Sequence, residues 1–485
     1  MENPMSMTPA VPVGHTIPGQ QTEKASELDA NVSYDGVSHV KPSWYRSVFF
    51  QVTIVGICAF LAPGIFNAMS LTGAGGAQSP YLVNTANAIL YSLLTVFCIF
   101  GGLLTNLIGF RFALMLGASG YALYAGGLYA NKVHGTQWLI LFGAAMNGIS
   151  GGIFWCTEGA IMIGYPEPRK VGRYLGLWLG WRNAGTLIGA SINLGLNVNT
   201  KAAGSLSSST YIVFIVLQCI GPLVGFFLSE PDKVQRPDGT PVLMKNPSPM
   251  AIEAKMMWTR VFTRWDVLAL CPIMLYSTWF SSYAGTFLSL YFNVRSRALA
   301  SFVTSFVSIM ANVALGMFLD STRISKKFKA RFAFISVFFI LNIAMWIWQT
   351  VMQVKYISSP PKALDWSAGA TWYQGWGVYV MVLIMYNINA NLLYWVISTM
   401  SDDPKDAVRL AGLLRGVEGA GGAGGFGMNT HKTLSKYVPL AFNFAFCVVS
   451  SIVAYPVIHR IGTPKANSPA PPSDITEVKE EVMQA

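Results

Sequence analysis

Four charged side chains lie in the interior of apolar stretches of this chain, away from the ends of each stretch: Glu158, Arg182, Arg415 and Glu418. Charged groups are costly at the depth of a bilayer, so they are functional candidates wherever an apolar stretch retains them. A carboxylate that exchanges an arginine partner for a proton is a relay element in proton-coupled transport. We therefore predict a candidate charge relay of Glu158, Arg182 and Glu418, in which Glu158 pairs directly with Arg182.

A structural interpretation of the same charges stays open. A buried ion pair can hold helices in register without any part in transport. Arg415 and Glu418 are three residues apart, which permits a local ion pair on one helix. For Glu158 and Arg182, the sequence does not choose between a relay and a structural pair.

The elements that must position these charges are membrane-spanning helices. Of the 485 residues, 53% are hydrophobic and only 11% are charged, a balance outside the range of soluble globular proteins. A helix needs roughly 20 apolar residues to span a bilayer. Twelve runs approach or exceed this length: 47–70, 81–104, 112–130, 137–163, 171–197, 209–228, 266–292, 298–318, 331–352, 376–400, 406–428 and 438–458. The sequence therefore predicts an all-α membrane protein with twelve transmembrane helices in the lipid bilayer.

The basic residues lie mostly in the loops between these runs, where such residues set the orientation of the helices in the membrane. The net charge of +11 therefore does not indicate a nucleic-acid partner. With a cytoplasmic N-terminus, 21 Lys and Arg flank the spans on the cytoplasmic side and eight on the other side. This asymmetry predicts a multi-pass protein with both termini cytoplasmic, in the plasma membrane or an endomembrane such as the vacuole.

The chain divides into two halves joined by a polar connection. We predict a disordered cytoplasmic N-terminal tail (1–43), a six-helix bundle (44–229), a cytoplasmic linker (230–264), a second six-helix bundle (265–459) and a disordered cytoplasmic C-terminal tail (460–485). Within the linker, residues 252–262 are either an amphipathic helix on the membrane surface or plain connection.

An internal repeat relates the two halves. A shift of 236 positions lays Gly176, Gly180, Gly185 and Asn193 onto identical residues, and lays Arg182 onto Glu418. Internal repeats of this kind are typical of transporter folds, so we predict two pseudo-symmetric bundles. The glycines of the span 171–197 occupy two opposite helix faces, and both faces are expected to have close neighbours.

The loop after the second run carries a spaced set of glycine, polar and basic residues, with a partial copy after the eighth run. We predict a candidate cytoplasmic gate there, made of Gly102, Asn106, Gly109, Arg111, Asp320 and Arg323. The set resembles the loop signature of the major facilitator superfamily, which implies that fold and a latch between the halves. The family has an acidic residue where this chain has Asn106, which weakens the latch. The alternative is an ordinary tight turn.

A more specific resemblance lies in the fourth and fifth runs. The stretch TEGAIMIGYPEPRKVGRYLGLWLGWRNAGTLIG, together with PGIFNAMSLTGAGG of the first run, is similar to the fungal branch of the uncoordinated-ninety-three-like (UNC-like) family of that superfamily. The resemblance implies twelve spans and a central cavity between the halves. It leaves function open, because the family includes transporters as well as regulatory or trafficking partners of other membrane proteins.

Neutral polar side chains recur at helical spacing on several spans. They either line a water-filled path or form hydrogen bonds that hold neighbouring helices together. We favour the lining because the first, fourth, seventh and tenth helices usually line the cavity of this fold. The candidates are Asn67, Asn87, Tyr91, Asn147, Tyr276, Trp279, Asn312, Asn387, Asn391 and Tyr394.

The sequence contains no pattern that indicates an enzyme. No grouping of His, Cys or carboxylates indicates catalysis, a metal or a cofactor, and the glycine pattern at 419–424 lies inside a span without the strand that a dinucleotide site requires. We therefore predict a secondary transporter that moves a small neutral or weakly polar organic solute, or a secondary metabolite, by alternating access. The alternative is an accessory protein that binds, regulates or escorts another membrane protein.

Overall fold

The computed structural model describes residues 43–77, 79–167, 170–242, 259, 263–361, 363–400 and 404–463. Most of both predicted tails lies outside the described residues, as does nearly all of the linker segment 252–262. Within the described residues the chain is helical and contains no β-strand.

Nine described helical segments are long and apolar enough to cross a membrane. They are Val48–Ser70 (α2 Val48–Ala59, η2 Phe60–Gly64 and α3 Ile65–Ser70), α4 (Pro80–Ile108, apolar over Pro80–Cys98), α6 (Trp138–Gly164), α8 (Ser208–Gly225), Trp265–Tyr291 (α10 Trp265–Trp279 and α11 Ser281–Tyr291), α12 (Val294–Asp320), Lys326–Ser358 (α13 Lys326–Phe334, η6 Ile335–Leu341 and α14 Asn342–Ser358), α15 (Ala370–Ser398) and α17 (Tyr437–Arg460). Short helical turns lie before the first of them, at Trp44–Arg46, and between successive ones, at Ala74–Gly76, Pro231–Lys233 and Trp366–Ala368.

Three further helices are as long but less apolar: α5 (Phe110–His134), α7 (Val171–Asn197) and α16 (Pro404–Met428). Glycine and polar residues dilute their hydropathy. With them, each of the twelve predicted spans coincides with one long helical segment of the structure.

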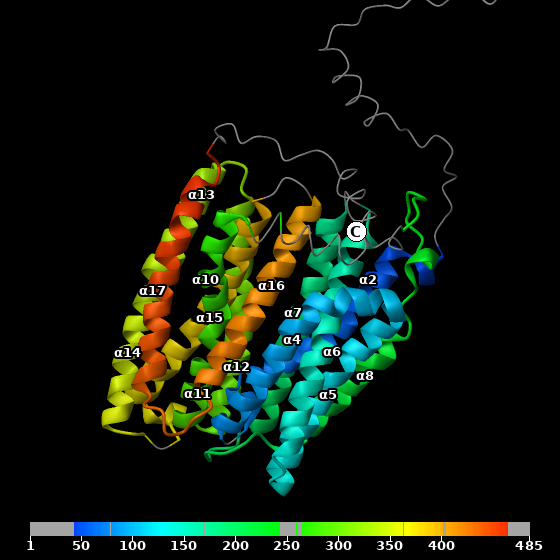
Figure 1. Cartoon of the computed structure of the whole chain (residues 1–485). Coiled ribbons are helices and arrows are strands. Elements are labelled where there is room, and N and C mark those ends of the chain that lie inside the picture. The colour runs from blue at the N-terminus through cyan, green and yellow to red at the C-terminus, as the bar shows by residue number, and fades with distance from the viewer. Residues whose placement is uncertain are drawn as a thin grey trace, which may run out of the picture.

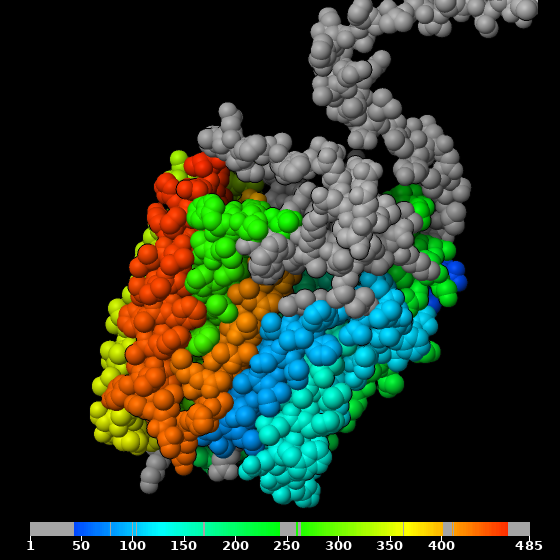
Figure 2. Space-filling model, in the orientation of Figure 1, coloured from blue at the N-terminus to red at the C-terminus, as the bar shows by residue number. Residues whose placement is uncertain are grey.

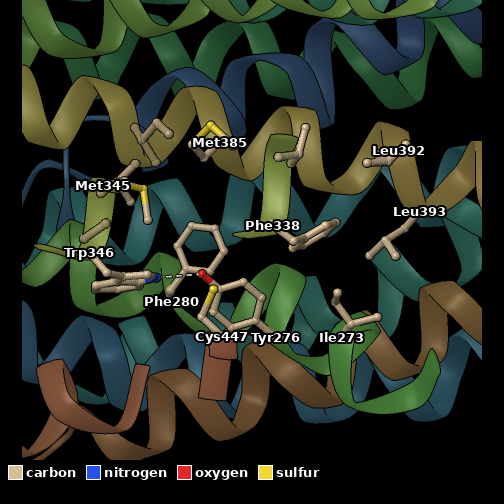
Figure 3. Close-up of a cluster of buried hydrophobic side chains, with 14 of the residues drawn as sticks. Ile273, Tyr276, Phe280, Phe338, Met345, Trp346, Met385, Leu392, Leu393 and Cys447 are labelled. Carbon is tan, nitrogen blue, oxygen red and sulfur yellow. Dashed lines mark hydrogen bonds between the residues drawn. The ribbon is translucent and has the colours of Figure 1, made fainter. Parts of the chain in front are cut away.

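The segments form two bundles that lie side by side (Figure 1). One apolar core runs from Val48 to Val242 and the other from Val267 to Ile458, so each half of the chain builds its own core. Val294, at the start of α12, is the exception, because it belongs to the core of the first bundle. In the second core, the Trp346 indole N–H donates to the Tyr276 hydroxyl at 2.8 Å (Figure 3).

The most extensive contacts between the bundles are those of α4 with α16 and of α7 with α12. Figure 2 shows α16 lying against α4 along one face of the molecule. The first and last described residues lie at the same end of the bundles (Figure 1), which we call the terminal end. The other end, where residues 71–77 and 198–207 lie, is called the opposite end. The charge asymmetry of the loops predicts that the terminal end faces the cytoplasm.

Pro63 shapes the first span at the level of the charged residues. It lacks the N–H that a helix interior requires, and the chain widens into a π-helical turn over Phe60–Gly64. Helix α7 crosses this turn closely, because a Cβ on Gly185 would lie 2.5 Å from the Phe60 carbonyl oxygen. This crossing fixes the position of Arg182, one turn before Gly185 on α7.

Candidate functional site

The inner charges of the two bundles meet around one indole. The Cζ atom of Arg182, on α7, lies 4.7 Å from the centroid of the Trp155 ring, and the Cζ atom of Arg415, on α16, lies 4.8 Å from it. Arg415 also lies 4.9 Å from the Tyr394 ring. A guanidinium over an aromatic face is attracted by the ring quadrupole. We call Trp155, Arg182, Tyr394, Arg415 and Glu418 the Trp155 cluster.

Arg415 has a carboxylate partner on its own helix. Its Nη1 atom lies 3.2 Å from Oε2 of Glu418, which forms the local pair that their spacing predicted. The Tyr394 hydroxyl donates to the same Oε2 at 3.4 Å. The side chain of Arg415 is 38% exposed while that of Glu418 is 5% exposed, so the arginine is the more exposed member of the pair.

The predicted direct pair between Glu158 and Arg182 is not formed in this conformation. Instead, the Trp178 indole N–H donates to Oε2 of Glu158 at 3.1 Å. Oε1 of Glu158 and Nε of Arg182 are both buried without a hydrogen-bond partner among the described residues. Arg182 turns towards Trp155, and the indole of Trp178 takes the place that the sequence assigned to the guanidinium.

The predicted lining residues separate into three groups. Asn87 and Tyr276 bond within their own bundles, to Tyr124 at 2.9 Å and Trp346 at 2.8 Å. Asn387 likewise donates to Ser308 at 3.2 Å. A second group carries buried polar atoms without a partner among the described residues: Asn147, Trp279 and Asn312.

The third group lies between the bundles or is accessible. The Tyr91 ring stacks on Phe426 of the other bundle with centroids 5.4 Å apart, and Tyr394 belongs to the Trp155 cluster. Asn391 is exposed, and Asn67 is partly buried beside the widened turn of the first span. These placements bring Tyr91 and Tyr394 to the bundle interface, and the lining role of the whole set remains a prediction.

No hydrogen bond or ion pair joins any two of the predicted gate residues, all of which lie in the described part of the chain. Gly102, Asn106, Asp320 and Arg323 are exposed, and a Cβ on Gly102 would have no described atom within 4 Å. Gly109 adopts a φ of +86° at the turn between α4 and α5, a conformation that favours glycine.

Arg111 bonds within the first bundle. Its Nε atom donates to the Leu228 carbonyl at 2.7 Å. The backbone N–H groups of Phe110 and Arg111 donate to the Glu230 carboxylate at 3.2 and 3.1 Å, which caps the N-terminus of α5. Sequence reasoning missed Glu230. Its signal was a carboxylate directly after the sixth span, on the side where basic residues gather.

The opposite end is closed by Arg297, which the sequence placed among ordinary loop cations. Its side chain is 1% exposed and donates to four carbonyl oxygens of the first bundle. The acceptors are Thr72 at 2.8 Å, Gly73 at 2.7 Å, Ala77 at 3.1 Å and Gly204 at 2.9 Å. Positive φ angles from Gly73 to Gly76 fold this loop around the guanidinium. In the sequence Arg297 lies 224 positions from Gly73 of this loop, so no local pattern connects the two.

Further bonds between the bundles surround Arg297. The Ser301 hydroxyl donates to the Ala68 carbonyl at 2.8 Å, and the Tyr379 hydroxyl donates to the Leu71 carbonyl at 2.8 Å. Nearby, Arg295 forms an ion pair with Asp365. The hydrogen bonds from Arg295 hold the pKa of Asp365 below its usual range.

At the terminal end, glycines of α7 and α16 lack close neighbours among the described residues. A Cβ on Gly172, Gly176 or Gly180 of α7, or on Gly412 or Gly416 of α16, would have no described atom within 4 Å. The expectation that both glycine faces of α7 have close neighbours is therefore wrong for its terminal half. Farther along α16, a Cβ on Gly419 would lie 2.4 Å from Oγ1 of Thr95 on α4. Among the described residues, the bundles are therefore in contact at the opposite end and at Gly419, and these five glycines have no close neighbour at the terminal end.

Solved structures share this architecture. A transporter of the POT family in complex with 5-aminolevulinic acid superposes with a TM-score of 0.59 at 11% identity, covering 85% of this chain and 96% of the other. The xylose transporter XylE from E. coli, in a partially occluded inward-open conformation, gives 0.57 at 11% identity, covering 84% and 97%. At such low identity the likeness shows the fold alone, an all-α fold of two helical bundles.

Sequence relatives are more specific. The Notoamide biosynthesis cluster protein O' of Aspergillus versicolor is 38% identical over 428 residues, covering 87% of this chain and 90% of the relative. UNC93-like protein 1 of Arabidopsis thaliana is 30% identical over 419 residues, covering 85% and 90%. Residues 78–354 match the family described as "Ion channel regulatory protein UNC-93". This multi-pass membrane protein therefore belongs to the UNC-93 family.

Proposed function

We propose that this protein is a secondary transporter in which the two bundles rock about a site at the level of the Trp155 cluster. The observation that carries the proposal is the contrast between the ends: Arg297 joins the bundles at the opposite end, and Gly176 and Gly416 have no described neighbour at the terminal end. Alternating access requires such a molecule to close one end while the other is open. With both termini in the cytoplasm, this conformation is open to the cytoplasm.

The cargo that we propose is a small, weakly polar organic solute or a secondary metabolite. The spans hold few charges, and aromatic rings surround the central site. The relative from Aspergillus versicolor is named for a biosynthesis cluster, which supports a role beside metabolite production. We propose the plasma membrane or an endomembrane such as the vacuole as its location, which a fluorescent fusion in the native cell tests.

The test is solute flux in proteoliposomes that contain the purified protein. A variant with Ala68→Cys and Ser301→Cys, in a background without the six native cysteines, places two thiols where a bond between the bundles is now found. Crosslinking these thiols is expected to hold the opposite end closed and stop flux, and reduction is expected to restore it. Each single-cysteine variant is the control. Unchanged flux through the crosslinked protein would contradict rocking.

A second candidate function is that of an accessory protein, which the description of the family as ion channel regulatory favours. In that case the protein binds or escorts another membrane protein, and the central charges hold its helices in register. Absence of flux for a panel of solutes, together with one membrane protein that co-purifies at fixed stoichiometry, is the result expected of this alternative.

A further inference from the structure

We propose that the Trp155 cluster binds the carboxylate of an organic acid, with the Arg182 guanidinium as its counter-charge. This inference rests on the proposed transport function and narrows the cargo from a weakly polar solute to one with an apolar body and a single anionic group. Three observations carry it: the unequal pairing of the two arginines, the access to them, and the aromatic surface around them.

The pairing of charges leaves Arg182 without a carboxylate. Arg415 has Glu418 at 3.2 Å, whereas Arg182 has no acidic oxygen within 4 Å among the described residues. Its Nε–H is buried and has no acceptor there. A guanidinium at bilayer depth without a counter-charge is costly, so this position favours an anion. A carboxylate fits best, because its two oxygens match the parallel N–H groups of a guanidinium.

Glu158 is the competing counter-charge within the chain. It is 1% exposed, and its Oε2 is held by the Trp178 indole. It lies more than 4 Å from Arg182, so a ligand carboxylate does not have to displace an existing ion pair. Removing the charge of Glu158 should therefore leave binding of an external carboxylate intact or strengthen it, while removing the charge of Arg182 should abolish it.

Arg415 is a partly exposed member of the cluster. Its side chain is 38% exposed although it contacts Trp155 of the other bundle. On the way to it, Gly176 and Gly180 on α7 and Gly416 on α16 present no side chain and have no described atom within 4 Å of an added Cβ. Among the described residues, no side chain at these three glycine positions obstructs an approach to the cluster from the terminal end.

The aromatic surface around the arginines determines which kind of ligand, apart from its carboxylate, fits the site. Trp155 and Tyr394 flank the arginines, and Phe426, whose ring stacks on Tyr91, lies about three turns beyond Arg415 along α16. Aromatic faces bind apolar and aromatic groups, with the few polar groups fixing orientation. The ligand class is therefore an aromatic or otherwise apolar monocarboxylic acid.

Binding of a matched pair of probes to the purified protein in nanodiscs tests the inference. Phenylacetate and phenylacetamide have the same ring and differ in the charge of one group. Phenylacetate at millimolar concentration is expected to raise the thermal unfolding temperature, and phenylacetamide is expected to have little effect. Arg182→Gln should weaken phenylacetate binding about tenfold to a hundredfold, because it removes a charge-assisted, bidentate contact.

Two variants control for loss of structure. Arg182→Lys keeps the positive charge but loses the planar guanidinium that bonds a carboxylate with two N–H groups. This variant should therefore bind phenylacetate more weakly than the parent protein and more tightly than Arg182→Gln. Arg460→Gln removes a guanidinium that lies 4.6 Å from the Trp265 ring, well away from the cluster, and should bind phenylacetate as the parent protein does. Glu158→Gln should bind it equally or more tightly.

The inference is overturned if the acid and the amide shift the unfolding temperature equally, if neither shifts it, or if Arg182→Gln binds the acid as the parent does. These outcomes are independent of flux. Binding of the acid without flux of any solute would contradict the transport function and leave the site standing. Flux of neutral solutes without binding of the acid would contradict the site and leave transport standing.

Discussion

The Nε atom of Arg297 lies 2.8 Å from the carbonyl oxygen of Thr72, and this bond joins the first turn of α12 to the glycine-rich loop of the other bundle. The guanidinium makes three further bonds to carbonyl oxygens in the same place. Hydrogen bonds to a charged group contribute roughly 1.5–3 kcal/mol each when buried. Arg297 is therefore the main polar tie that keeps the opposite end closed.

Replacing Arg297 should open that end. In a cysteine-free background, Ser301→Cys is expected to react slowly with a membrane-impermeant maleimide, because Ser301 is fully buried against Ala68. Adding Arg297→Gln should raise the labelling rate about tenfold or more, since it removes several charge-assisted bonds. Ser359→Cys, which is exposed, should label equally in both backgrounds. An unchanged rate at Ser301→Cys would show that apolar packing alone closes this end.

Glu158→Gln separates the relay from the structural interpretation. The amide oxygen of glutamine can still accept the hydrogen bond from Trp178, so the unfolding temperature should change by only a few degrees. A relay nevertheless requires a group that gains and loses a proton, so proton-driven uptake should fall about a hundredfold or more. Exchange of solute without a proton gradient is the control and should persist. Full proton-driven uptake by the well-folded variant would leave Glu158 with a structural role.

The ion pair between Arg295 and Asp365 predicts an acid-sensitive contribution to stability. Hydrogen bonds from Arg295 lower the pKa of Asp365 in the folded protein. A lowered carboxyl pKa stabilises the fold above the unfolded pKa of about 4 and loses that stabilisation as the pH falls below it. The unfolding temperature of Asp365→Asn should therefore lie below that of the parent at neutral pH, and the difference should shrink in acid. A difference that does not depend on pH would contradict this assignment.

Two glycines of α16 provide a matched pair. A Cβ on Gly425 would lie 2.1 Å from the Trp279 carbonyl oxygen, so Gly425→Ala should cost about 1–3 kcal/mol of stability. A Cβ on Gly416 has no described atom within 4 Å, so Gly416→Ala should be neutral or stabilise by up to about 1 kcal/mol.

Flux measurements with a larger side chain at Gly416 test whether the bundles approach each other at this position. If the bundles approach each other at Gly416 during the cycle, Gly416→Leu should retain the unfolding temperature of the parent and lose flux, because the larger side chain prevents closure. Thermal unfolding and proteoliposome flux measure the two effects separately. Normal flux by Gly416→Leu would show that the terminal halves of α4 and α16 never come together.

The positions of the helices could be predicted because hydropathy acts locally. Even the glycine-diluted runs 112–130 and 406–428 correspond to the helices α5 and α16. The pair Arg415 and Glu418 could also be predicted, since a spacing of three residues on one helix brings side chains together whatever surrounds them. The repeat correctly predicted two bundles because the two halves share their glycine positions.

The contacts between helices could not be read in the same way. Glu158 and Arg182 lie on neighbouring helices at suitable depths, yet the rotation of α7 places Trp178 on the carboxylate and turns Arg182 to Trp155. Likewise, Arg297 was counted as a loop cation, and only the fold of residues 71–77 around it makes it the tie between the bundles.

The sequence by itself determined which segments cross the membrane, that the chain is duplicated and which few charges the membrane interior retains, because each of these follows from local composition and spacing. The tertiary structure decided which charges meet, which glycines are covered and which end is closed. Those outcomes depend on the rotation and tilt of each helix against its neighbours, and many small packing contacts far apart in the chain set them together. The meeting of Arg182 and Arg415 at Trp155 is one such outcome, since the three residues come from three helices and both bundles.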